Sequence, residues 1–232
     1  MSRILLITGS RKGIGRYLAE YYLKKDYLVI GFSRSESDLT HANYKHFLLD
    51  VADENAVSKS VRSIFKEYKR IDYLINNAGI ASMNHFLLTP LSIVSKVFET
   101  NFKGTFNFSR EVGKIMSRQK FGRIINFTTV ARPLNLEGEA VYASSKSAVE
   151  TFTRVMAKEL GHLGITCNLI GPSPIKTDLI KNIPKNKIDD LIQMQAIPEF
   201  SEFKDVSNVT DFFLSDESEM ITGQTIYLSG VN

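Results

Sequence analysis

Cysteine, tryptophan and long apolar runs are what this sequence has least of. Cys167 is the single cysteine, so an internal disulfide and a cysteine-cluster metal site are excluded. No apolar run approaches the roughly 20 residues of a membrane span. The stretch after Met1-Ser2-Arg3 is too short for a secretory signal. The 29 Lys and Arg and 25 Asp and Glu give a net charge of +4 and are scattered, so nucleic acid is not expected as a partner. These features predict a cytoplasmic protein with no metal site and no membrane partner.

The order of apolar segments predicts one domain over residues 1–232. A hydrophobic share of 43% and a charged share of 23% are typical of globular chains. Strands that alternate with helices predict a seven-stranded parallel sheet of the doubly wound Rossmann α/β type, with ligands at the carboxyl ends of the strands. A short helix is also expected within residues 34–43, and another within 178–200. The strands are expected at residues 4–7, 27–32, 44–49, 72–75, 123–128, 165–170 and 224–228, and the main helices at 14–25, 54–68, 91–116 (as two helices), 142–161 and 206–214.

The first strand leads into a glycine-rich turn, Thr8-Gly9-Ser10-Arg11-Lys12-Gly13-Ile14-Gly15. Between a strand and a helix, such a turn can hold a pyrophosphate against the helix amino end. Gly9 permits the tight turn, Gly13 lets the backbone approach the phosphates, and Gly15 lets the helix pack on the strand. A plain strand-to-helix turn is the alternative, and three glycines in register make it the weaker one.

Tyr142 and Lys146 are spaced so that a helix places them on one face. An ammonium beside a phenol favours the phenolate, so the Tyr142 pKa is predicted to fall below its ordinary value of about 10. Such a phenol can exchange a proton with a substrate oxygen. Taken alone, the spacing is better explained by a tyrosine and a lysine on the solvent face of an amphipathic helix. The catalytic interpretation of the pair therefore depends on its context.

In this order the motifs resemble the short-chain dehydrogenase/reductase family, and most of all its 3-oxoacyl-[acyl-carrier-protein] reductases. Thr8–Gly15 matches the family's TGxxxGxG, and Asn76–Gly79 matches its NNAG. Asn101, Tyr142 and Lys146 match catalytic positions of the family. The resemblance extends over nearly the whole chain.

The resemblance implies a role for each matching residue. Lys146 would bond the nicotinamide ribose, and Asn101 would hold a water that links Lys146 to solvent. For Asn101 the alternative is a polar helix residue whose hydrogen bonds are satisfied at a helix kink. For Asn77–Gly79 the alternative is a structural turn. The implied cofactor contacts are Gly9, Ser10, Arg11, Lys12, Gly13, Ile14 and Gly15 at the pyrophosphate, Asp50 and Val51 at the adenine, Asn77, Ala78 and Gly79 on the adenosine side, and Pro172, Ser173, Ile175 and Thr177 together with Tyr142 and Lys146 at the nicotinamide end.

Two positions depart from the family's pattern. Thr129 replaces the catalytic serine: it keeps a hydroxyl donor, but its β-branch restricts χ1. Thr128 has the same chemistry, but successive strand residues face opposite ways, and the spacing to Tyr142 favours Thr129. Ser173 stands in place of a glycine, which puts the close approach of its loop to the nicotinamide in question.

The end of the second strand predicts NADP(H) rather than NAD(H). NAD-selective sites place a carboxylate there for the ribose 2′-hydroxyl, whereas this chain has Ser33 and Arg34. Ser33 can donate to a 2′-phosphate, and Arg34 can meet it with a charged, planar fork. Lys12 and Arg11 are expected at the same end of the site. Cations that merely belong to the surface are the alternative.

The predicted activity is NADPH-dependent interconversion of a ketone or 3-oxoacyl group and a secondary alcohol. Tyr142 would protonate the forming alkoxide while Thr129 donates a hydrogen bond to it. Two alternatives stay open. One is a reductase of sugar or secondary-metabolite biosynthesis, and the other is a catalytically weak, dinucleotide-binding regulatory protein.

The sequence defines the substrate less well. Lys181, Lys185 and Lys187 would suit an anionic substrate such as an acyl thioester, although lysines of this kind more often form a solvated surface. Leu163 stands where acyl-carrier reductases often have a basic residue. The resemblance also implies a homodimer or homotetramer that associates through the helices within residues 91–116 and 142–161.

Overall fold

Seven parallel strands form one sheet within residues 2–181 and 183–231, the part of the chain that the computed structural model describes. Their order is β3-β2-β1-β4-β5-β6-β7. From β1 the chain builds outward to β3, returns to β4 beside β1, and then builds outward the other way. The predicted doubly wound Rossmann-type fold is thereby confirmed. The strands are β1 (Ile4–Thr8), β2 (Leu28–Ser33), β3 (Tyr44–Leu48), β4 (Tyr73–Asn76), β5 (Gly122–Phe127), β6 (Ile165–Gly171) and β7 (Thr225–Tyr227).

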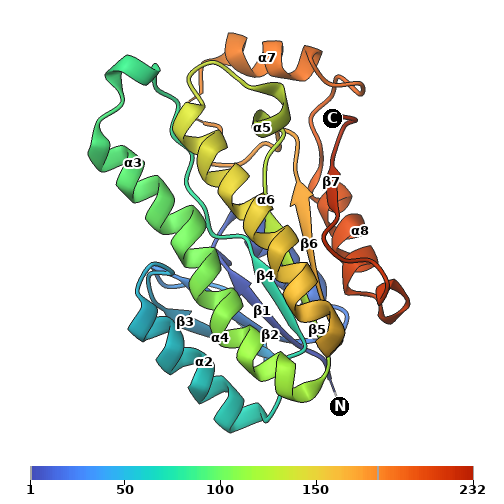
Figure 1. Cartoon of the computed structure of the whole chain (residues 1–232). Helices are drawn as coiled ribbons and strands as arrows, with labels where there is room; N and C mark the ends of the chain where they lie inside the picture. Colours follow the sequence, from blue (N-terminus) through green and yellow to red (C-terminus); the bar gives the residue numbers. More distant parts are fainter. Residues whose placement is uncertain (1, 182, 232) are drawn as a thin grey trace.

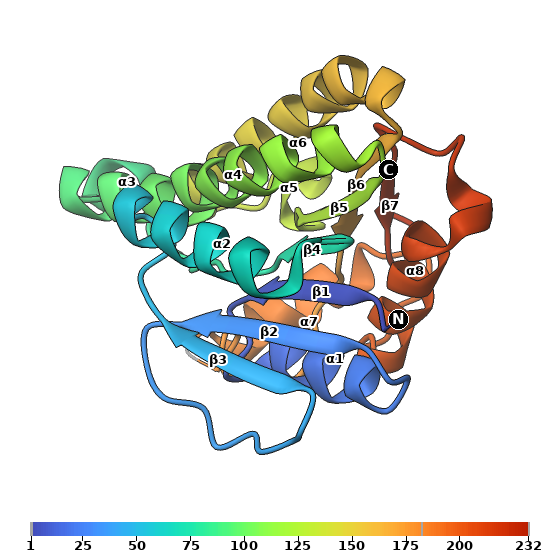
Figure 2. The same cartoon turned by 90° about the horizontal axis from the view of Figure 1, so that it is seen from below.

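Helices cover both faces of the sheet. They are α1 (Gly13–Leu23), α2 (Glu54–Tyr68), α3 (Leu91–Phe98), α4 (Gly104–Gln119), α5 (Ala131–Leu134), α6 (Ala140–Leu160), α7 (Lys185–Gln193) and α8 (Phe203–Leu214). Figure 1 and Figure 2 show α2, α4 and α6 on one face and α1 and α8 on the other. Across the described residues, no helix combines the length and the apolar composition that crossing a membrane requires.

The two faces of β1 contribute to two separate cores, because successive strand residues point to opposite sides. Leu6 lies in a cluster with Phe108 of α4, whereas Leu5 lies in a cluster with Tyr22 of α1. All four side chains are fully buried. Burial of one leucine side chain contributes about 1.5–3 kcal/mol to folding. An uninterrupted apolar run therefore belongs at the centre of the sheet.

The segment between β2 and β3 corrects one prediction. The sequence predicts a short helix within residues 34–43, but that described stretch is extended and turned, without a helix. Ser37 Oγ accepts from Leu39 N at 3.3 Å, and His41 Nδ1 accepts from Asn43 N at 3.1 Å. Side chains that bind nearby backbone donors compete with helix formation, and here they prevail.

The helix predicted at residues 91–116 is divided in two, as expected, by a π-helical turn at Glu99–Lys103. Such turns widen the helix locally and often occur at functional sites. Asn101 lies in this turn and is fully buried. Gly104, the first residue of α4, lets the helix lie close to Val51, since a Cβ there would be 2.5 Å from Val51 Cγ2. The turn and this close packing fix the position of Asn101 against the sheet.

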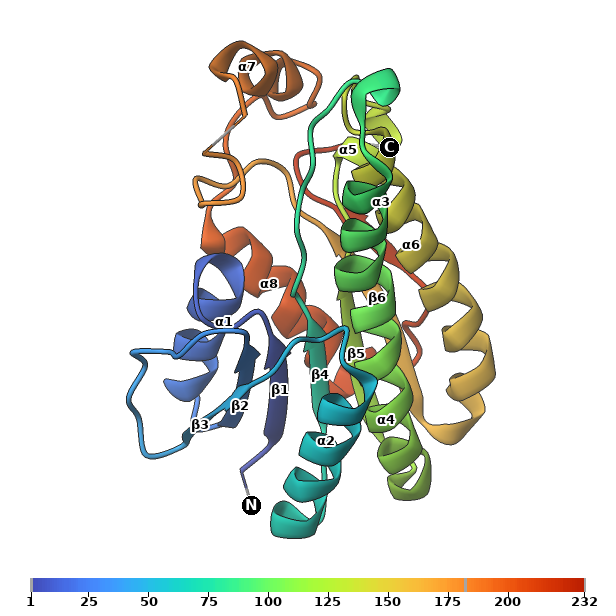
Figure 3. The ribbon, with the colours of Figure 1, turned by 90° about the vertical axis from the view of Figure 1, so that its left-hand side faces the viewer.

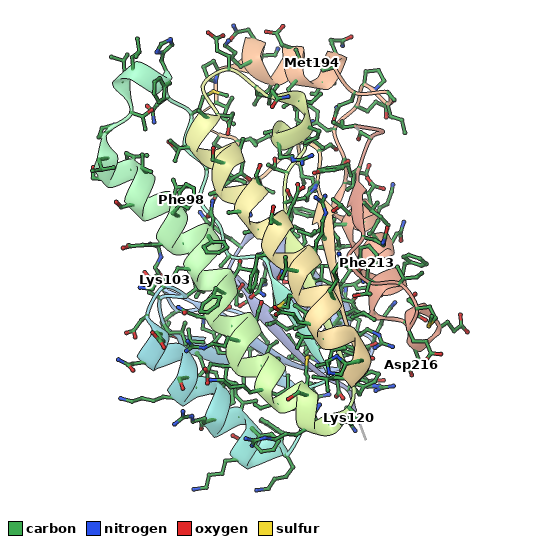
Figure 4. The ribbon with its side chains drawn as sticks, in the orientation of Figure 1. Phe98, Lys103, Lys120, Met194, Phe213 and Asp216 are labelled. Carbon is green, nitrogen blue, oxygen red and sulfur yellow. The ribbon has the colours of Figure 1, made fainter. Side chains whose placement is uncertain are left out.

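The carboxyl ends of the strands meet at one end of the molecule. Figure 3 shows α7, α5 and the start of α3 gathered at this end. In Figure 4, Met194, which follows α7, lies there, and Lys120, which follows α4, lies at the opposite end. The strand order reverses between β1 and β4, and doubly wound sheets bind ligands at such a point.

Candidate active site

A cavity of about 470 Å³ opens at the carboxyl ends of β1, β2 and β4. Most residues that the sequence predicts to hold a cofactor lie in its walls. Ser10 and Gly15 do not, because both are buried behind the glycine turn. The predicted residues that line it are Gly9, Arg11, Lys12, Gly13, Ile14, Ser33, Arg34, Asp50, Val51, Asn77, Ala78, Gly79 and Thr177.

The three glycines of this turn are needed for different reasons. Gly9 and Gly13 have φ of +69° and +60°, in the left-handed region that favours glycine. A Cβ on Gly15 would lie 2.4 Å from the Gly9 carbonyl oxygen, so this glycine lets α1 pack on the turn. A Cβ on Gly13 would meet nothing closer than Thr177 Cγ2 at 3.7 Å. The backbone at Gly13 is therefore open to the cavity.

The amino end of α1 begins at this open backbone. Its N-cap residue, Lys12, is extended and makes no side-chain cap, and the first turn carries no acidic residue. The first N–H groups of a helix have no intrahelical partner, and the helix end carries partial positive charge. This arrangement suits the pyrophosphate of a dinucleotide.

The turn after β4 is fastened to the glycine turn. Asn77 Nδ2 donates to the carbonyl oxygens of Thr8 and Gly9 at 3.0 and 3.2 Å. Ala78 N donates to Thr8 Oγ1 at 3.0 Å. Asn77 and Ala78 thus make the structural turn that the sequence leaves open as an alternative, and they line the cavity as well.

The cations of the cavity divide into two groups. Arg11 and Arg34 are exposed in its walls. Lys12 instead places Nζ 2.9 Å from Asp178 Oδ2, in the segment after β6. Asp178 thus draws the Lys12 ammonium toward the segment after β6, and the expected place of Lys12 at the 2′-phosphate end stays a prediction. Arg34 beside Ser33 remains at the end of β2.

A chain of hydrogen bonds connects the glycine turn to the end of β2. Ser10 Oγ lies 3.2 Å from Tyr44 OH, which lies 2.8 Å from His46 Nδ1. His46 Nε2 lies 3.0 Å from Ser33 Oγ. Burial lowers the pKa of His46. Nothing in the sequence motifs points to Tyr44 and His46; the only signal is their alternate spacing, which puts them on one face of β3.

A second cavity, of about 160 Å³, adjoins the first. The two share Gly79 and Thr177 in their walls. The second cavity is enclosed by the segments after β5 and β6, the start of α6, and α7. The predicted site residues in its walls are Ile14, Asn77, Gly79, Thr129, Tyr142, Lys146, Pro172, Ser173, Ile175 and Thr177.

Tyr142 and Lys146 lie on the buried face of α6, with 8% and 5% of their surfaces exposed. The alternative of a solvent-facing pair is therefore wrong. Lys146 Nζ donates to the Phe127 carbonyl oxygen at 2.9 Å and lies 5.9 Å from the centre of the Tyr142 ring. Burial lowers the pKa of Lys146 to about 8.

The predicted fall of the Tyr142 pKa is also wrong. Burial raises this pKa, and the Glu139 carboxylate raises it further, while a hydrogen bond with Thr129 opposes them. Burial disfavours the charged phenolate, and the Lys146 ammonium is directed to the Phe127 carbonyl rather than to the phenol. The fold therefore favours the protonated phenol of Tyr142.

The two neighbouring threonines face different partners. Thr128 Oγ1 donates to Glu150 Oε1 of α6 at 2.6 Å. Thr129 is hydrogen-bonded to Tyr142, and its Oγ1 also accepts from Ala131 N at 3.2 Å. The geometry thus matches the strand register that puts Thr129, and not Thr128, beside the tyrosine.

Asn101 fastens the π-helical turn to the segment after β4. Its Oδ1 accepts from Ile80 N at 2.9 Å, and its Nδ2 donates to Ile80 O and Ser145 Oγ, both at 3.0 Å. Thr105 Oγ1 donates to the Asn101 carbonyl oxygen at 2.8 Å. The side chain of Asn101 is thus held by protein partners on both sides.

Ser173, which stands where the family has a glycine, has its hydroxyl hydrogen-bonded to two other serines. Ser229 Oγ donates to Ser173 Oγ at 2.9 Å, and Ser201 Oγ is a second partner. Ser173 is not among the residues with positive φ, so the backbone here does not require glycine. The loop from Pro172 to Thr177 still lines the cavity.

Comparison with known proteins agrees with this geometry. A family model described as enoyl-(acyl carrier protein) reductase matches residues 9–230. The 3-oxoacyl-[acyl-carrier-protein] reductase of Escherichia coli (strain K12) is 30% identical over 234 residues, which cover 98% of this chain and 96% of that protein. The solved structure of ElxO with NADP bound has a TM-score of 0.91 at 30% identity, covering 99% of this chain and 98% of its own. Ligand-free aldohexose dehydrogenase of Thermoplasma acidophilum has a TM-score of 0.89 at 26% identity, covering 99% and 93%. The chain therefore belongs to the short-chain dehydrogenase/reductase family and is an oxidoreductase.

Proposed function

We propose that this protein interconverts a ketone and a secondary alcohol with NADP(H). The observation that carries the proposal is the junction of two cavities. One has a cradle suited to a pyrophosphate, and the other contains the buried Thr129, Tyr142 and Lys146. Gly79 and Thr177 lie in the walls of both. When bound, the nicotinamide supplies or accepts the hydride.

The residues of the first cavity fit NADP(H). The open backbone at Gly13 and the uncapped start of α1 suit the pyrophosphate. At the end of β2, Ser33 and Arg34 stand where an NAD-selective site would have a carboxylate, so they suit a 2′-phosphate. The similar ElxO structure has NADP bound, which supports the same choice for this chain.

Tyr142 is the proton donor in the reductive direction. Because burial raises its pKa, the phenol is protonated near neutral pH and can protonate an alkoxide as it forms. Thr129, hydrogen-bonded to Tyr142, presents a second hydroxyl to the same oxygen. Lys146 is anchored by the Phe127 carbonyl oxygen and keeps two further donors for the ribose and a charge that offsets the phenolate left behind.

The substrate has an apolar part. Much of the second cavity's wall is aliphatic, with contributions from α7 and the segment before it, as in Ile180, Ile188 and Leu191. The lysines that would suit an anionic substrate are largely engaged. Lys181 pairs with Asp178, and Lys187 Nζ lies 3.0 Å from Glu137 Oε2. The relatives named for 3-oxoacyl thioesters and for aldohexoses make both classes candidates.

Turnover of a substrate panel tests the proposal. NADPH oxidation is followed with acetoacetyl thioesters and aryl ketones, and NADP reduction with aldohexoses and secondary alcohols. We expect NADPH-dependent turnover of at least one carbonyl compound, and its loss in Tyr142→Phe. Tight NADPH binding without turnover across the panel would instead support the regulatory alternative. The two departures from the family's pattern, Thr129 and Ser173, are what favours that alternative. Against it, Thr129 lies beside Tyr142, and Ser173 does not have the positive φ that would require glycine.

We also propose that the chain self-associates as a homodimer or homotetramer through α4 and α6, the outer layer on one side of the sheet (Figure 1). Phe102 and Phe106 each pack on Phe152 of α6, with ring centres 5.8 Å apart. All three rings remain partly exposed, and aromatic side chains are enriched at interfaces. Light scattering on size-separated protein tests this; Phe152→Lys is expected to shift the mass toward that of the monomer.

A further inference from the structure

Glu139 is a buried carboxylate that the proposed chemistry does not use. It lies three residues before Tyr142, lines the second cavity and is 4% exposed. Its Oε2 has no hydrogen-bond partner among the described residues. Burial raises the pKa of Glu139 to about 7, with no cation to oppose the shift.

The other two buried glutamates show what a structural carboxylate looks like in this fold. Glu150, 1% exposed, accepts from Thr128 and lies 3.2 Å from an Arg154 nitrogen. Glu111, 6% exposed, lies 2.7 Å from Lys114 Nζ. Leaving a buried polar group without a partner costs free energy. Glu139 departs from this pattern, so its burial calls for a partner that the described part of the chain does not supply.

Two ordinary structural roles are open to Glu139, and it adopts neither. It occupies the N-cap position of α6, but its side chain makes no cap hydrogen bond, although a carboxylate there would be stabilised by the free N–H groups. The two lysines of the cavity wall are engaged elsewhere: Lys187 is bound by Glu137, and Lys146 donates to the Phe127 carbonyl oxygen.

The backbone holds Glu139 firmly in this position. Glu139 N donates to Leu136 O at 3.2 Å, and Ala143 N donates to Glu139 O at 2.7 Å. The preceding Gly138 has φ of +84° and accepts from Asn84 N at 2.9 Å. Figure 1 shows the start of α6 beside α5 and below α7, the elements that enclose this cavity. The carboxylate is thus presented by a fixed segment and not by a mobile loop.

We propose that Glu139 anchors the substrate by accepting a hydrogen bond from a hydroxyl or ammonium group close to the reacting carbonyl. Residues three apart on a helix have Cβ atoms about 5–6 Å apart, so a donor near Glu139 lies a few bonds from a carbonyl at Tyr142. Apart from the reacting group of Thr129, Tyr142 and Lys146, much of the wall is aliphatic, as in Leu136 and Leu191. A few placed polar groups in a largely apolar cavity are a usual source of specificity.

This inference rests on the proposed function and narrows its substrate class to hydroxy- or amino-ketones and the matching diols or amino alcohols. A simple 3-oxoacyl thioester presents only acceptors beside its ketone. Above a pH of about 7 Glu139 is ionised, and its carboxylate repels such acceptors, so Glu139 then disfavours that class relative to a donor-bearing ketone.

A matched pair of ketones tests the hydroxyl case. Phenacyl alcohol carries a hydroxyl where propiophenone carries a methyl. At about pH 8, where Glu139 is mostly ionised, we expect wild type to favour phenacyl alcohol in kcat/KM by about tenfold or more, the factor expected for a hydrogen bond to a charged group. Glu139→Gln, which keeps the size and removes the charge, should lose most of this ratio. The control Glu137→Gln removes a neighbouring exposed charge and should retain it. Glu139→Asp, which keeps the charge, is a second variant for the same ratio of kcat/KM.

Binding without turnover tests the ammonium case and separates the two proposals. Phenethylamine binding in the presence of NADP is measured by calorimetry, and Glu139→Gln should weaken it about tenfold while Glu137→Gln does not. If both ketones are reduced with a ratio near one, or with a ratio that Glu139→Gln leaves unchanged, the anchor is overturned and the proposed function stands. If neither ketone is reduced, the calorimetry alone decides: binding lost with Glu139 supports the anchor, and equal binding in wild type and variant overturns it.

Discussion

The two ends of the joined cavity are built in different ways. The end that we assign to adenosine and pyrophosphate consists of strand ends and turn backbone, fastened by hydrogen bonds to backbone such as those that Asn77 donates to Thr8 and Gly9. The walls of the substrate end consist largely of side chains, including those of Thr129, Tyr142 and α7. Backbone geometry specifies the first end, and side-chain burial specifies the second.

The electrostatics of the two ends differ accordingly. At the first end the cations Arg11 and Arg34 are exposed, so salt and water screen them. At the second end Tyr142, Lys146 and Glu139 are all buried. Burial raises the pKa of Tyr142 and Glu139 and lowers that of Lys146, so it favours the neutral form of each group. We therefore expect substitutions at the substrate end to change rate and pH behaviour, and those at the other end to change cofactor choice.

The largest expected effect comes from Tyr142→Phe. Removing the phenol should lower kcat by about 10²–10⁴ because it removes the general acid, while the ring still packs in the cavity. NADPH affinity, measured by fluorescence titration, should change little. A variant that kept wild-type turnover on a confirmed substrate would show that another group protonates the alkoxide, and the comparison between the two ends would fail.

Thr129→Val should be next in size. Valine keeps the shape of threonine but lacks the donor beside Tyr142, so kcat should fall by about 10²–10³. Thr128→Val is the matched control: it breaks the bond to Glu150 and should reduce stability more than rate. The reverse ranking in kcat would place Thr128 at the substrate oxygen.

The features that the sequence predicts well are those set by local backbone geometry, and those that it predicts poorly depend on side-chain burial. The helix predicted at residues 54–68 follows Asp53, a residue type preferred at the N-cap, and Asp53 Oδ1 accepts from Ala56 N at 3.0 Å. The positions of the strands along the chain and the glycine turn are likewise predicted from local patterns. The helix predicted within residues 34–43 does not form, because Ser37 and His41 bind nearby backbone N–H groups and so compete with helix formation.

At the site, the sequence indicates which residues meet but not their charge states. The pairing of Lys12 with Asp178 joins residues far apart in the chain. The raised pKa of Tyr142 and the lone carboxylate of Glu139 depend on burial by segments that spacing rules do not place. Long-range burial, not local pattern, decides these features.

Glu139 also makes the stability of the fold depend on pH. Its pKa rises from 4.5 to about 7 on folding, so the folded state favours the protonated acid. The neutral form carries no penalty below about pH 4.5, and stability falls as the pH rises to about 7, by on the order of 3 kcal/mol in total. Urea unfolding of wild type and Glu139→Gln, at about pH 4.5 and about pH 8, should show a difference that grows with pH. Glu137→Gln should show no such growth, and parallel curves for Glu139→Gln and wild type would contradict the burial of a charged Glu139.

Cofactor choice tests the other end of the cavity. Ser33→Asp combined with Arg34→Ala places a carboxylate at the end of β2 and removes the guanidinium. Because one charge-assisted bond is worth about 1.5–3 kcal/mol, the preference for NADPH over NADH in kcat/KM should fall at least tenfold. Lys12→Ala should change this preference far less, because Lys12 pairs with Asp178. A wild type that prefers NADH would overturn the assignment.

The smallest expected effect concerns His46, which acts through Ser33. His46 Nε2 lies 3.0 Å from Ser33 Oγ, and Ser33 Oγ also donates to Ser35 O at 2.6 Å. His46→Phe keeps a ring on β3 but frees Ser33 from one of its two fixed partners. A neutral hydrogen bond contributes about 0.5–1.5 kcal/mol, so NADPH affinity should weaken about two- to tenfold. NADH lacks the 2′-phosphate, so its affinity should stay near that of wild type, and calorimetric titration with both cofactors measures the difference. Equal losses for both cofactors would mean that His46 supports the glycine turn through Tyr44 and Ser10 rather than the 2′-phosphate corner.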